Sequence, residues 1–516
     1  MLFNSYIFIF VYLPLTLAVF FLLGRAGQQQ RATSWLVFMS LLFYGWWNPV
    51  YLALILGSMS FNYVIGAALG PRAAGSREAR QLLAFGVTID LLLLGYYKYA
   101  NFFVDNWNIT AGTNFALGEI VLPLGISFFT FTQVAYLVDA YRGEAREYNP
   151  LHYALFVTYF PHLIAGPVLH HKEMMPQFAK PVIYRFDVAH FTAGTVYFLM
   201  GLFKKVVVAD GISAYATPVF AAAADGLPLT TLDAWGGALA YTFQLYFDFS
   251  GYSDMAIGLA LMMGVRLPLN FNSPYKAANI SDFWRRWHMT LSRFLRDYLY
   301  ISLGGNRGGE IRRYVNLFMT MLLGGLWHGA GWTFVLWGAL HGAYLVIHHG
   351  WRALLQAVGW VERKPTIIGR AIGTALTFIA VVVGWVFFRA EDLPTALHIL
   401  AAMFMQGSFE LSRFYSAVIA ESGLAEWLAL SGVRCPEWVL LASAEALLLV
   451  AVMTWPNTQE LLWTEYQAPD PEAVRPTPGS RLRWQPNILW TTVMAVAGTW
   501  ALLSLSSVSE FLYFQF

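Results

Sequence analysis

The chain of 516 residues is 58% hydrophobic and only 12% charged, whereas soluble domains carry about 25% charged residues. This composition excludes a soluble globular protein and indicates a protein whose length is used in repeated membrane crossings. The formal net charge of +2 says little without its distribution. The single cysteine, Cys435, excludes an internal disulfide framework and a cysteine-based metal site.

The first hydrophobic segment, residues 6–24, is not preceded by basic residues and is long enough to cross a membrane. We therefore expect a retained first helix rather than a cleaved signal peptide. Further windows, some shortened or broken by Gly and Pro, predict an all-α polytopic membrane protein with roughly 11 spans plus re-entrant or interfacial helices. We expect residues 1–516 to form one membrane domain. The later windows are 34–48, 51–69, 82–97, 117–138, 151–168, 187–203, 231–263 (expected to hold two elements), 314–349, 371–388, 395–405, 437–455 and 488–507.

The distribution of Lys and Arg predicts the orientation of the first spans, because cytoplasmic loops are enriched in these residues. Basic residues follow the first and third windows, whereas residues 101–113 contain none. The N-terminus is therefore expected on the periplasmic side, together with residues 101–113. The basic residues concerned are Arg25 and Arg31, then Arg72, Arg77 and Arg80.

Two polar interruptions break the hydrophobic pattern. In residues 160–167, two prolines and a glycine accompany His162. In residues 244–254, Asp248 and Asp254 stand in an otherwise apolar stretch and need partners. They are interpreted either as structural ion-pair or hydrogen-bond anchors, or as the polar lining of a tunnel. The residues predicted to line such a tunnel are His162, Asp248, Ser250, Tyr252 and Trp327.

Residues 266–313 hold the largest concentration of charge, nine basic residues against three acidic ones, which leaves +6. Within them, residues 282–300 have helical periodicity with one apolar and one basic face, and Ser281 or Asp282 is a candidate helix cap. This helix either lies against anionic lipid headgroups or forms a vestibule for a polyanionic cytoplasmic ligand, such as a nucleotide-bearing donor. The glycines of residues 303–309 either bring backbone N–H groups to phosphate or form a plain flexible turn. The expected donor-binding residues are Arg285, Arg286, Arg293, Arg296, Asn306 and Arg307.

The uncharged run 314–351 carries a histidine, His328, 15 residues after Arg313. In a helix this is about 22 Å, near the middle of a bilayer. Four nearby glycines favour a broken segment followed by a second helix. His328 is either a buried histidine hydrogen-bonded to a neighbouring helix or a neutral general base that activates a hydroxyl group. The glycines are Gly324, Gly325, Gly329 and Gly331.

The other histidines do not form a pattern with a metal-ligand spacing, so we expect no metal site. His170 and His171 follow the interruption at residues 160–167, and the rest are interpreted as packing or interface residues. Phosphate-loop and nucleophile-elbow motifs are also absent from the sequence, which gives no support to ATP-driven transport or to serine-hydrolase chemistry. The remaining histidines are His152, His190, His341, His348, His349 and His398.

Three motifs in order resemble the membrane-bound O-acyltransferase (MBOAT) family. They are DFWRRWH at 282–288, YISLGGNRGG at 300–309 and GGLWHGA at 324–330. The FPHLIAGP stretch at 160–167, the FDFSGYSDMAIG stretch at 247–258 and the C-terminal FLYFQF at 511–516 resemble the branch that acetylates alginate and cellulose. The resemblance covers nearly the whole chain, and residues 408–487 contribute least to it.

The resemblance implies many helices around a central tunnel that opens to a cytoplasmic funnel, with His328 as catalytic base and His288 as a second functional residue. It implies relay of an acetyl group from a cytoplasmic thioester, with acetyl-CoA as the expected donor and no bound cofactor, across a bacterial inner membrane. The receiver would be a periplasmic partner resembling SGNH hydrolases, working with exopolysaccharide machinery, and no nucleic-acid partner is expected. Two alternatives stay open, a transporter or flippase for an acylated carrier or glycan and a non-catalytic scaffold.

Overall fold

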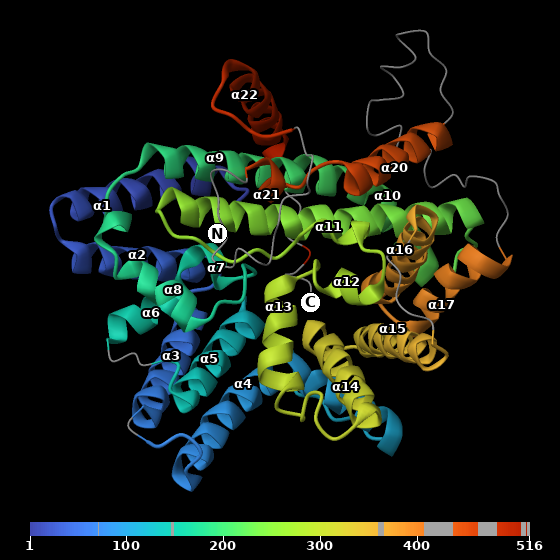
Figure 1. Cartoon of the computed structure of the whole chain (residues 1–516), viewed down its shortest axis with the longest axis horizontal. Helices are drawn as coiled ribbons and strands as arrows, with labels where there is room; N and C mark the ends of the chain where they lie inside the picture. The colour runs from blue at the N-terminus through green and yellow to red at the C-terminus, as the bar shows by residue number, and fades with distance from the viewer. Residues whose placement is uncertain are drawn as a thin grey trace. The chain divides into compact units, whose positions relative to one another are not determined.

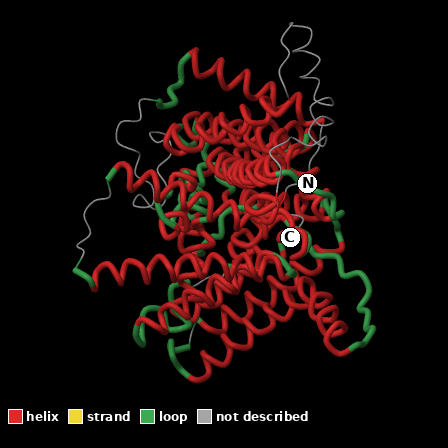
Figure 2. The backbone as a smooth tube through the Cα atoms, turned by 90° about the vertical axis from the view of Figure 1, so that its right-hand side faces the viewer, coloured by secondary structure: helices red, strands yellow, loops and turns green. Residues whose placement is uncertain are grey.

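The computed structural model describes residues 1–70, 72–145, 149–359, 366–406, 437–462, 482–506 and 512. Within these ranges every regular element is a helix, which confirms the expected all-α class (Figure 2). Cys435 and the C-terminal motif 511–516, except residue 512, lie outside the described residues.

The chain forms two compact units, and α11, Thr231–Met262, contributes residues to both. The first unit comprises Met1–Phe203, Gly251–Asn270 and Thr458–Gln515. Its other helices, labelled in Figure 1 where there is room, are η1 Phe8–Tyr12, α1 Leu13–Arg25, α2 Gln29–Gly45, α3 Val50–Leu69, α4 Arg77–Ala111, α5 Ile126–Arg142, α6 Pro150–Thr158, α7 Phe160–Leu163, α8 His171–Phe178, η2 Pro181–Tyr184, α9 Val188–Phe203, α21 Thr458–Leu461, α22 Ile488–Leu503 and η7 Ser504–Ser506.

The second unit comprises Lys204–Ser250 and Phe271–Asn457, with Phe516. It holds most of the residues that the sequence assigns to chemistry. Besides the first part of α11, its helices are η3 Lys204–Ala209, α10 Asp210–Ala224, η4 Pro274–Lys276, α12 Ile280–Trp284, α13 Met289–Phe294, η5 Leu295–Tyr300, α14 Glu310–His328, α15 Trp332–Ala357, α16 Ile367–Arg389, α17 Leu393–Ala401, η6 Ala402–Gln406 and α20 Glu437–Thr454.

Among the described residues, five helices are long and apolar enough to cross a membrane. A multi-pass membrane protein is thereby confirmed, whereas the count of about 11 spans, the tunnel and the single domain stay predictions. The five helices are Phe8–Arg25, Val50–Leu69, Arg77–Ala111, Val188–Ala224 and Ile367–Arg389.

The window 231–263 was expected to hold two elements, and this expectation is wrong because α11 runs unbroken through it. Its glycines serve packing instead of interrupting the helix. A Cβ atom on Gly201 of α9 would lie 2.5 Å from the carbonyl oxygen of Gly251, and one on Gly194 would lie 2.6 Å from that of Gly258. Two glycines seven residues apart on each helix therefore let the two backbones touch, a common arrangement in membrane helix pairs.

The expected continuous helix at 282–300 is also wrong. The structure divides it into α12, α13 and the π-helix η5, with a break at residues 285–288. The cap is neither Ser281 nor Asp282. The side chain of Asn279 accepts a hydrogen bond from the Asp282 N–H at 2.9 Å, as an N-cap residue does.

The break expected at residues 160–167 is confirmed, since α6 ends at Thr158 and a single turn, α7, follows. The Ser40 hydroxyl accepts the Phe160 N–H at 3.1 Å and so satisfies a backbone donor at the break.

Candidate active site

The uncharged run 314–351 forms two helices that lie side by side, α14 and α15 (Figure 1). His328 is the last residue of α14, and the chain then passes through Gly329 and Gly331 in extended conformation. Gly329 cannot be replaced without a shift, because a Cβ atom there would lie 2.2 Å from the Phe334 ring. The break that the glycines predicted is confirmed, and it fixes His328 at a helix C-terminus.

Glycines also set how closely α14 and α15 approach each other. A Cβ atom on Gly325 would lie 2.4 Å from the Phe334 carbonyl oxygen, and one on Gly338 would lie 2.5 Å from the Met321 carbonyl oxygen. The two backbones are therefore in van der Waals contact one turn before His328. The position of His328 therefore depends on how closely α14 and α15 pack.

His328 is 5% exposed and is surrounded by aromatic rings from three helices. Its ring centroid lies 4.9 Å from Trp327 of α14, 5.0 Å from Trp337 of α15 and 5.2 Å from Phe388 of α16. All three rings meet the imidazole edge to face, at 67° to 88°. The ring plane is therefore held by packing, and predicted Trp327 lies in direct contact with the predicted base.

Another histidine, His341, contacts the same Trp337 ring as His328, although the sequence analysis interpreted it only as a packing or interface residue. It is fully buried, and its ring lies 4.8 Å from Trp337, which also contacts His328. Gly384 of α16 leaves room for it, since a Cβ atom there would lie 2.8 Å from His341 Nε2. The position of His341 thirteen residues after His328, within the same uncharged run, was the available signal.

His288 is fully buried and has a left-handed backbone, with φ of 42°. Outside glycine this conformation is uncommon, and histidine is among the residues that adopt it more often. The imidazole lies 4.7 Å from the Phe249 ring at 86°, and burial lowers the pKa of His288 to about 3. His288 is therefore neutral at physiological pH and precedes the first turn of α13.

A continuous set of aromatic contacts joins the break at 285–288 to His328. Trp284 contacts Trp337 at 5.8 Å, and Trp337 contacts His328. On a parallel route, Trp287 lies 4.8 Å from Trp385, which lies 5.5 Å from Phe388 on the other side of His328. The structure thus brings the His288 motif and the His328 motif into one packed cluster.

The six predicted donor-binding residues lie in the same unit, and four of them, Arg285, Arg296, Asn306 and Arg307, are exposed. Some already have local partners. Arg286 donates to Asp282 at 3.0 Å and to the Asn272 carbonyl oxygen at 3.2 Å, and Arg296 donates to Asp297 at 2.7 Å. Arg286 therefore fixes the loop around the motif, while Arg285 and Arg307 present charge outward.

The glycine-rich stretch 303–309 leads into α14. Gly304, Gly305, Gly308 and Gly309 all have positive φ, and the Asn316 side chain donates to the Gly305 carbonyl oxygen at 3.0 Å. The Tyr300 hydroxyl donates to the Asn306 side chain at 2.5 Å. The stretch is a turn of defined shape tied to α14, and phosphate binding by it stays a prediction.

Asp248 is paired with a residue that the sequence reading missed. Its carboxylate lies 2.6 Å from Lys205 Nζ, which also contacts Asp210 at 2.7 Å, and Asp248 and Lys205 are both buried. The structure therefore gives Asp248 the ion-pair anchor that was one of its two interpretations. A lysine pair directly after the hydrophobic window 187–203, Lys204 and Lys205, was the signal.

The other predicted tunnel residues are divided between the units. Ser250 lies in the unit of His328, whereas His162 and Tyr252 lie in the other unit. His162 bonds the Phe156 carbonyl oxygen at 2.9 Å, and the Tyr252 ring lies 4.9 Å from Phe3. Asp254, the second aspartate of that stretch, accepts from the Thr458 hydroxyl at 2.6 Å. His162, Tyr252 and Asp254 therefore have structural partners, and the exposure of the predicted residues to a tunnel stays a prediction.

Within the described residues no cluster of three or more His, Cys, Asp or Glu side chains has the arrangement of a metal site. The described residues define an integral membrane protein of helices in which the polar groups of interest are buried imidazoles held by aromatic rings, with arginines at the nearby surface.

Known proteins place this arrangement in a family. The profile of the MBOAT, membrane-bound O-acyltransferase family, matches residues 29–388, and the chain belongs to that family. It is a membrane-bound O-acyltransferase, as the three motifs predicted.

Three relatives illustrate the range of the family. The chain is 43% identical to the protein named "Probable alginate O-acetylase AlgI" of Pseudomonas aeruginosa, and the alignment covers 100% of both chains. It is 43% identical to a peptidoglycan O-acetyltransferase of Helicobacter pylori over 78% of this chain and 80% of the relative. It is 29% identical to a teichoic acid D-alanyltransferase of Bacillus subtilis over 53% of this chain and 70% of the relative.

Proposed function

We propose that the protein transfers an acetyl group from a cytoplasmic thioester to a hydroxyl acceptor across a bacterial inner membrane, for acetylation of an alginate-type exopolysaccharide. The observation that supports this best is His328, buried among three aromatic rings at the end of α14, together with the full-length similarity to an alginate O-acetylase. Acetyl-CoA is the proposed donor. A periplasmic SGNH-hydrolase-like protein of the exopolysaccharide machinery is the proposed receiver.

In the proposed step, the acceptor O–H gives its proton to a neutral nitrogen of His328 while its oxygen attacks the carbonyl carbon of the thioester. An ester C–O bond forms and the C–S bond breaks. The electron pair leaves on sulfur as thiolate, which takes up the proton from His328. The histidine returns to its neutral form, and the reaction requires no metal or redox partner.

The surroundings of His328 suit a general base that carries a positive charge only during the transfer step. The imidazolium formed during the step would lie at the C-terminus of α14, where the backbone carbonyls carry partial negative charge. The Trp327 and Trp337 rings, at 4.9 and 5.0 Å, add attraction between a cation and an aromatic face. These interactions stabilise the transition state more than the neutral ground state, which is what lowers a barrier.

The donor side of the proposal depends on the exposed arginines. Arg285, Arg296 and Arg307 lie on the unit that contains His328, and a segment with a net charge of +6 would concentrate an anionic donor at its surface. His288 would orient donor or acceptor in its neutral form, beside the same aromatic cluster.

The test uses purified protein in nanodiscs with labelled acetyl-CoA and an alginate oligosaccharide, with and without a periplasmic fraction. Release of CoA thiol and transfer of label are both measured. We expect His328→Ala to lower both rates by 10²-fold or more, the usual contribution of a general base. His190→Ala is the matched control, because His190 lies in the other unit with a one-third exposed side chain.

The outcomes separate the candidates. Undiminished thiol release by His328→Ala removes His328 from the mechanism. Intact acetyl-CoA, with an acylated carrier moved across a liposome membrane, favours the transporter alternative. Label found on alginate only when the periplasmic fraction is present supports the relay, whereas direct labelling of the oligosaccharide shows that no partner is required.

A further inference from the structure

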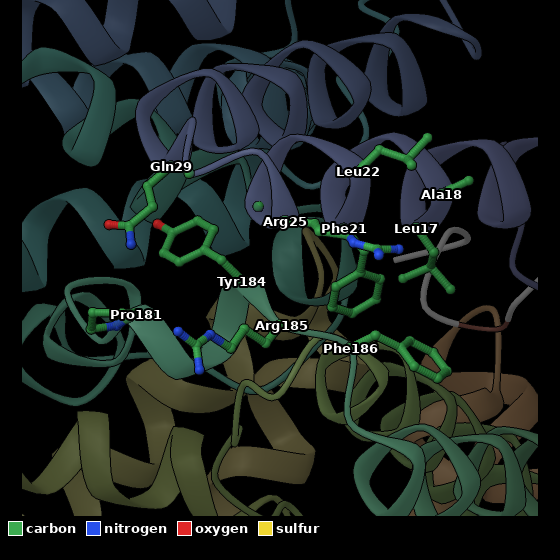
Figure 3. Close-up of a pocket in the computed structure, with 12 residues that line it drawn as sticks. Leu17, Ala18, Phe21, Leu22, Arg25, Gln29, Pro181, Tyr184, Arg185 and Phe186 are labelled. Carbon is green, nitrogen blue, oxygen red and sulfur yellow. The ribbon is translucent and has the colours of Figure 1, made fainter.

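A cavity of about 820 Å³ lies in the first unit, and none of its lining residues belongs to the candidate active site (Figure 3). This volume is within the range of small-molecule sites, about 300–1,000 Å³. One wall is the last two turns of α1, and the other is the segment from Pro181 to Phe186, which contains η2. Since α1 is the second part of the candidate span Phe8–Arg25, the cavity lies beside the end of a candidate membrane helix.

The α1 wall changes from apolar to cationic along its length. Leu17, Phe21 and Arg25 are spaced four residues apart, so they form one stripe about 12 Å long on the helix. Leu22, 65% exposed, extends the apolar part. A ligand that matches this stripe has a long apolar portion and an anionic end.

The opposite wall also combines an apolar residue with a cationic one. Phe186, 54% exposed, meets Phe21 edge to face at 5.4 Å, and Arg185 stands next to it in the chain. In Figure 3 the Arg25 and Arg185 side chains come from the two walls of the cavity. No acidic residue lines the cavity, and within the described residues neither guanidinium makes an ion pair. The nearby Asp187 accepts the His190 N–H at 2.8 Å.

The walls are held in place. Helix α1 touches η2 through Gly24, where a Cβ atom would lie 2.2 Å from the Tyr184 carbonyl oxygen. The Tyr184 hydroxyl donates to the Phe178 carbonyl oxygen at 3.0 Å and lies 3.0 Å from the Thr33 hydroxyl. Tyr184 is buried and fixed on both sides, so the cavity keeps its shape without a ligand.

We propose that this cavity binds an anionic phospholipid, with its headgroup at the arginines of the two walls, Arg25 and Arg185, and an acyl chain along Leu17, Phe21 and Leu22. Charge complementarity selects the headgroup, and the apolar wall of Leu17, Phe21 and exposed Leu22 at the end of a candidate membrane span selects a lipid rather than a water-soluble anion. Because Arg25 ends the first candidate span and Arg31 follows it, we expect this end on the cytoplasmic side, so the lipid would come from the cytoplasmic leaflet. The site is independent of the proposed acyl transfer.

The test measures thermal stabilisation of the purified full-length protein in a neutral detergent by phosphatidylglycerol, by phosphatidylcholine and by inorganic phosphate. We expect selective stabilisation by phosphatidylglycerol. In R25Q/R185Q the apparent affinity should fall on the order of 30-fold, because each arginine near an anionic headgroup contributes about fivefold. R77Q/R80Q is the matched control, because it removes two exposed arginines from the first turn of α4 in the same unit.

Each other outcome overturns the proposal. Equal stabilisation by phosphatidylglycerol and phosphatidylcholine shows that the cavity does not prefer an anionic headgroup. An equal fall of lipid affinity in R25Q/R185Q and R77Q/R80Q shows a general effect of the protein's charge. Stabilisation by inorganic phosphate alone, lost in R25Q/R185Q, shows a site for free phosphate. Ala18→Trp keeps both arginines and narrows the apolar part, so undiminished lipid binding by this variant excludes the acyl-chain path.

Discussion

The left-handed backbone of His288 has a measurable consequence for stability. A side chain other than glycine in this conformation costs about 1–2 kcal/mol, so removing the Cβ atom should relieve strain. We therefore expect His288→Gly to melt at a higher temperature than His288→Ala, by about 1 kcal/mol in unfolding free energy, although both lose the imidazole. Thermal unfolding in detergent measures the difference.

Thr290, in regular helix two residues later, supplies the control for His288. In a regular helix alanine is more stable than glycine, so the free energy of unfolding of Thr290→Ala should exceed that of Thr290→Gly by about 0.5–1 kcal/mol. If alanine is also the more stable substitution at position 288, the backbone there is not strained.

Burial of His288 also predicts how the stability of the protein depends on pH. Burial lowers the pKa of His288 from 6.5 to about 3. Below pH 6.5 this histidine is therefore protonated in the unfolded chain but stays neutral in the folded protein. The contribution of neutral His288 to the free energy of unfolding is fully present above pH 6.5 and is lost as the pH falls toward 3. Between pH 7 and 5, wild type should lose about 2 kcal/mol more than His288→Asn. Parallel pH profiles of the two proteins would contradict this.

At the scale of helices, the contact of α14 with α15 should control activity through the position of His328. Gly338→Ala places a Cβ atom 2.5 Å from the Met321 carbonyl oxygen and forces the two helices apart. We expect a fall in kcat of at least tenfold, with a smaller loss of folded protein, because misplacement of a base by about 1 Å is enough for a large loss. Acetyl-transfer rates and size-exclusion profiles measure the two effects.

Gly350→Ala is the control for this interface. It makes the same change on the same helix, but nothing lies within 4 Å of the added atom. It should keep full activity and be as stable or slightly more stable, since alanine favours helix. Equal losses of activity in both variants would show that the interface does not position His328.

The sequence predicts a helix boundary correctly where neighbouring residues alone determine it. The glycines after His328 mark a helix break, and α14 does end there. The glycines at 251 and 258 look alike in sequence but pack against α9 within an unbroken helix, because only tertiary contact tells the two uses apart. Likewise the period of residues 282–300 is helical, yet the helix breaks at His288, whose backbone is left-handed and whose ring packs against Phe249.

At the scale of the site, residue chemistry alone singles out His328 and the basic segment, because each is costly or unusual in a membrane protein, whereas His288 is implied only by the family motif. The sequence could not identify His341 or Lys205. Their roles depend on the Trp337 ring and on the Asp248 carboxylate, which are brought to them by other helices. Pairings between distant parts of the chain carry no local pattern.

For the whole molecule, the charge distribution predicts which loops face the cytoplasm. The segment 266–313 carries a net charge of +6 and the proposed donor surface, so we expect it to be cytoplasmic, whereas residues 101–113 contain no Lys or Arg and are expected to be periplasmic. The single natural cysteine makes this testable by labelling. In a Cys435→Ser background, Ser302→Cys and Asn114→Cys each place one thiol at an exposed position in the two regions, residue 114 lying directly after the second.

A membrane-impermeant maleimide should label the Asn114→Cys protein in intact cells. The Ser302→Cys protein should be labelled only after the inner membrane is opened, and the Cys435→Ser parent should not be labelled at all. Labelling of the Ser302→Cys protein in intact cells would place the arginines on the periplasmic side. The donor could then not be a cytoplasmic thioester bound by Arg285 and Arg307. The same experiment therefore tests the orientation of the chain and the direction of acyl transfer, because the donor must meet the positively charged surface on the side where it is made.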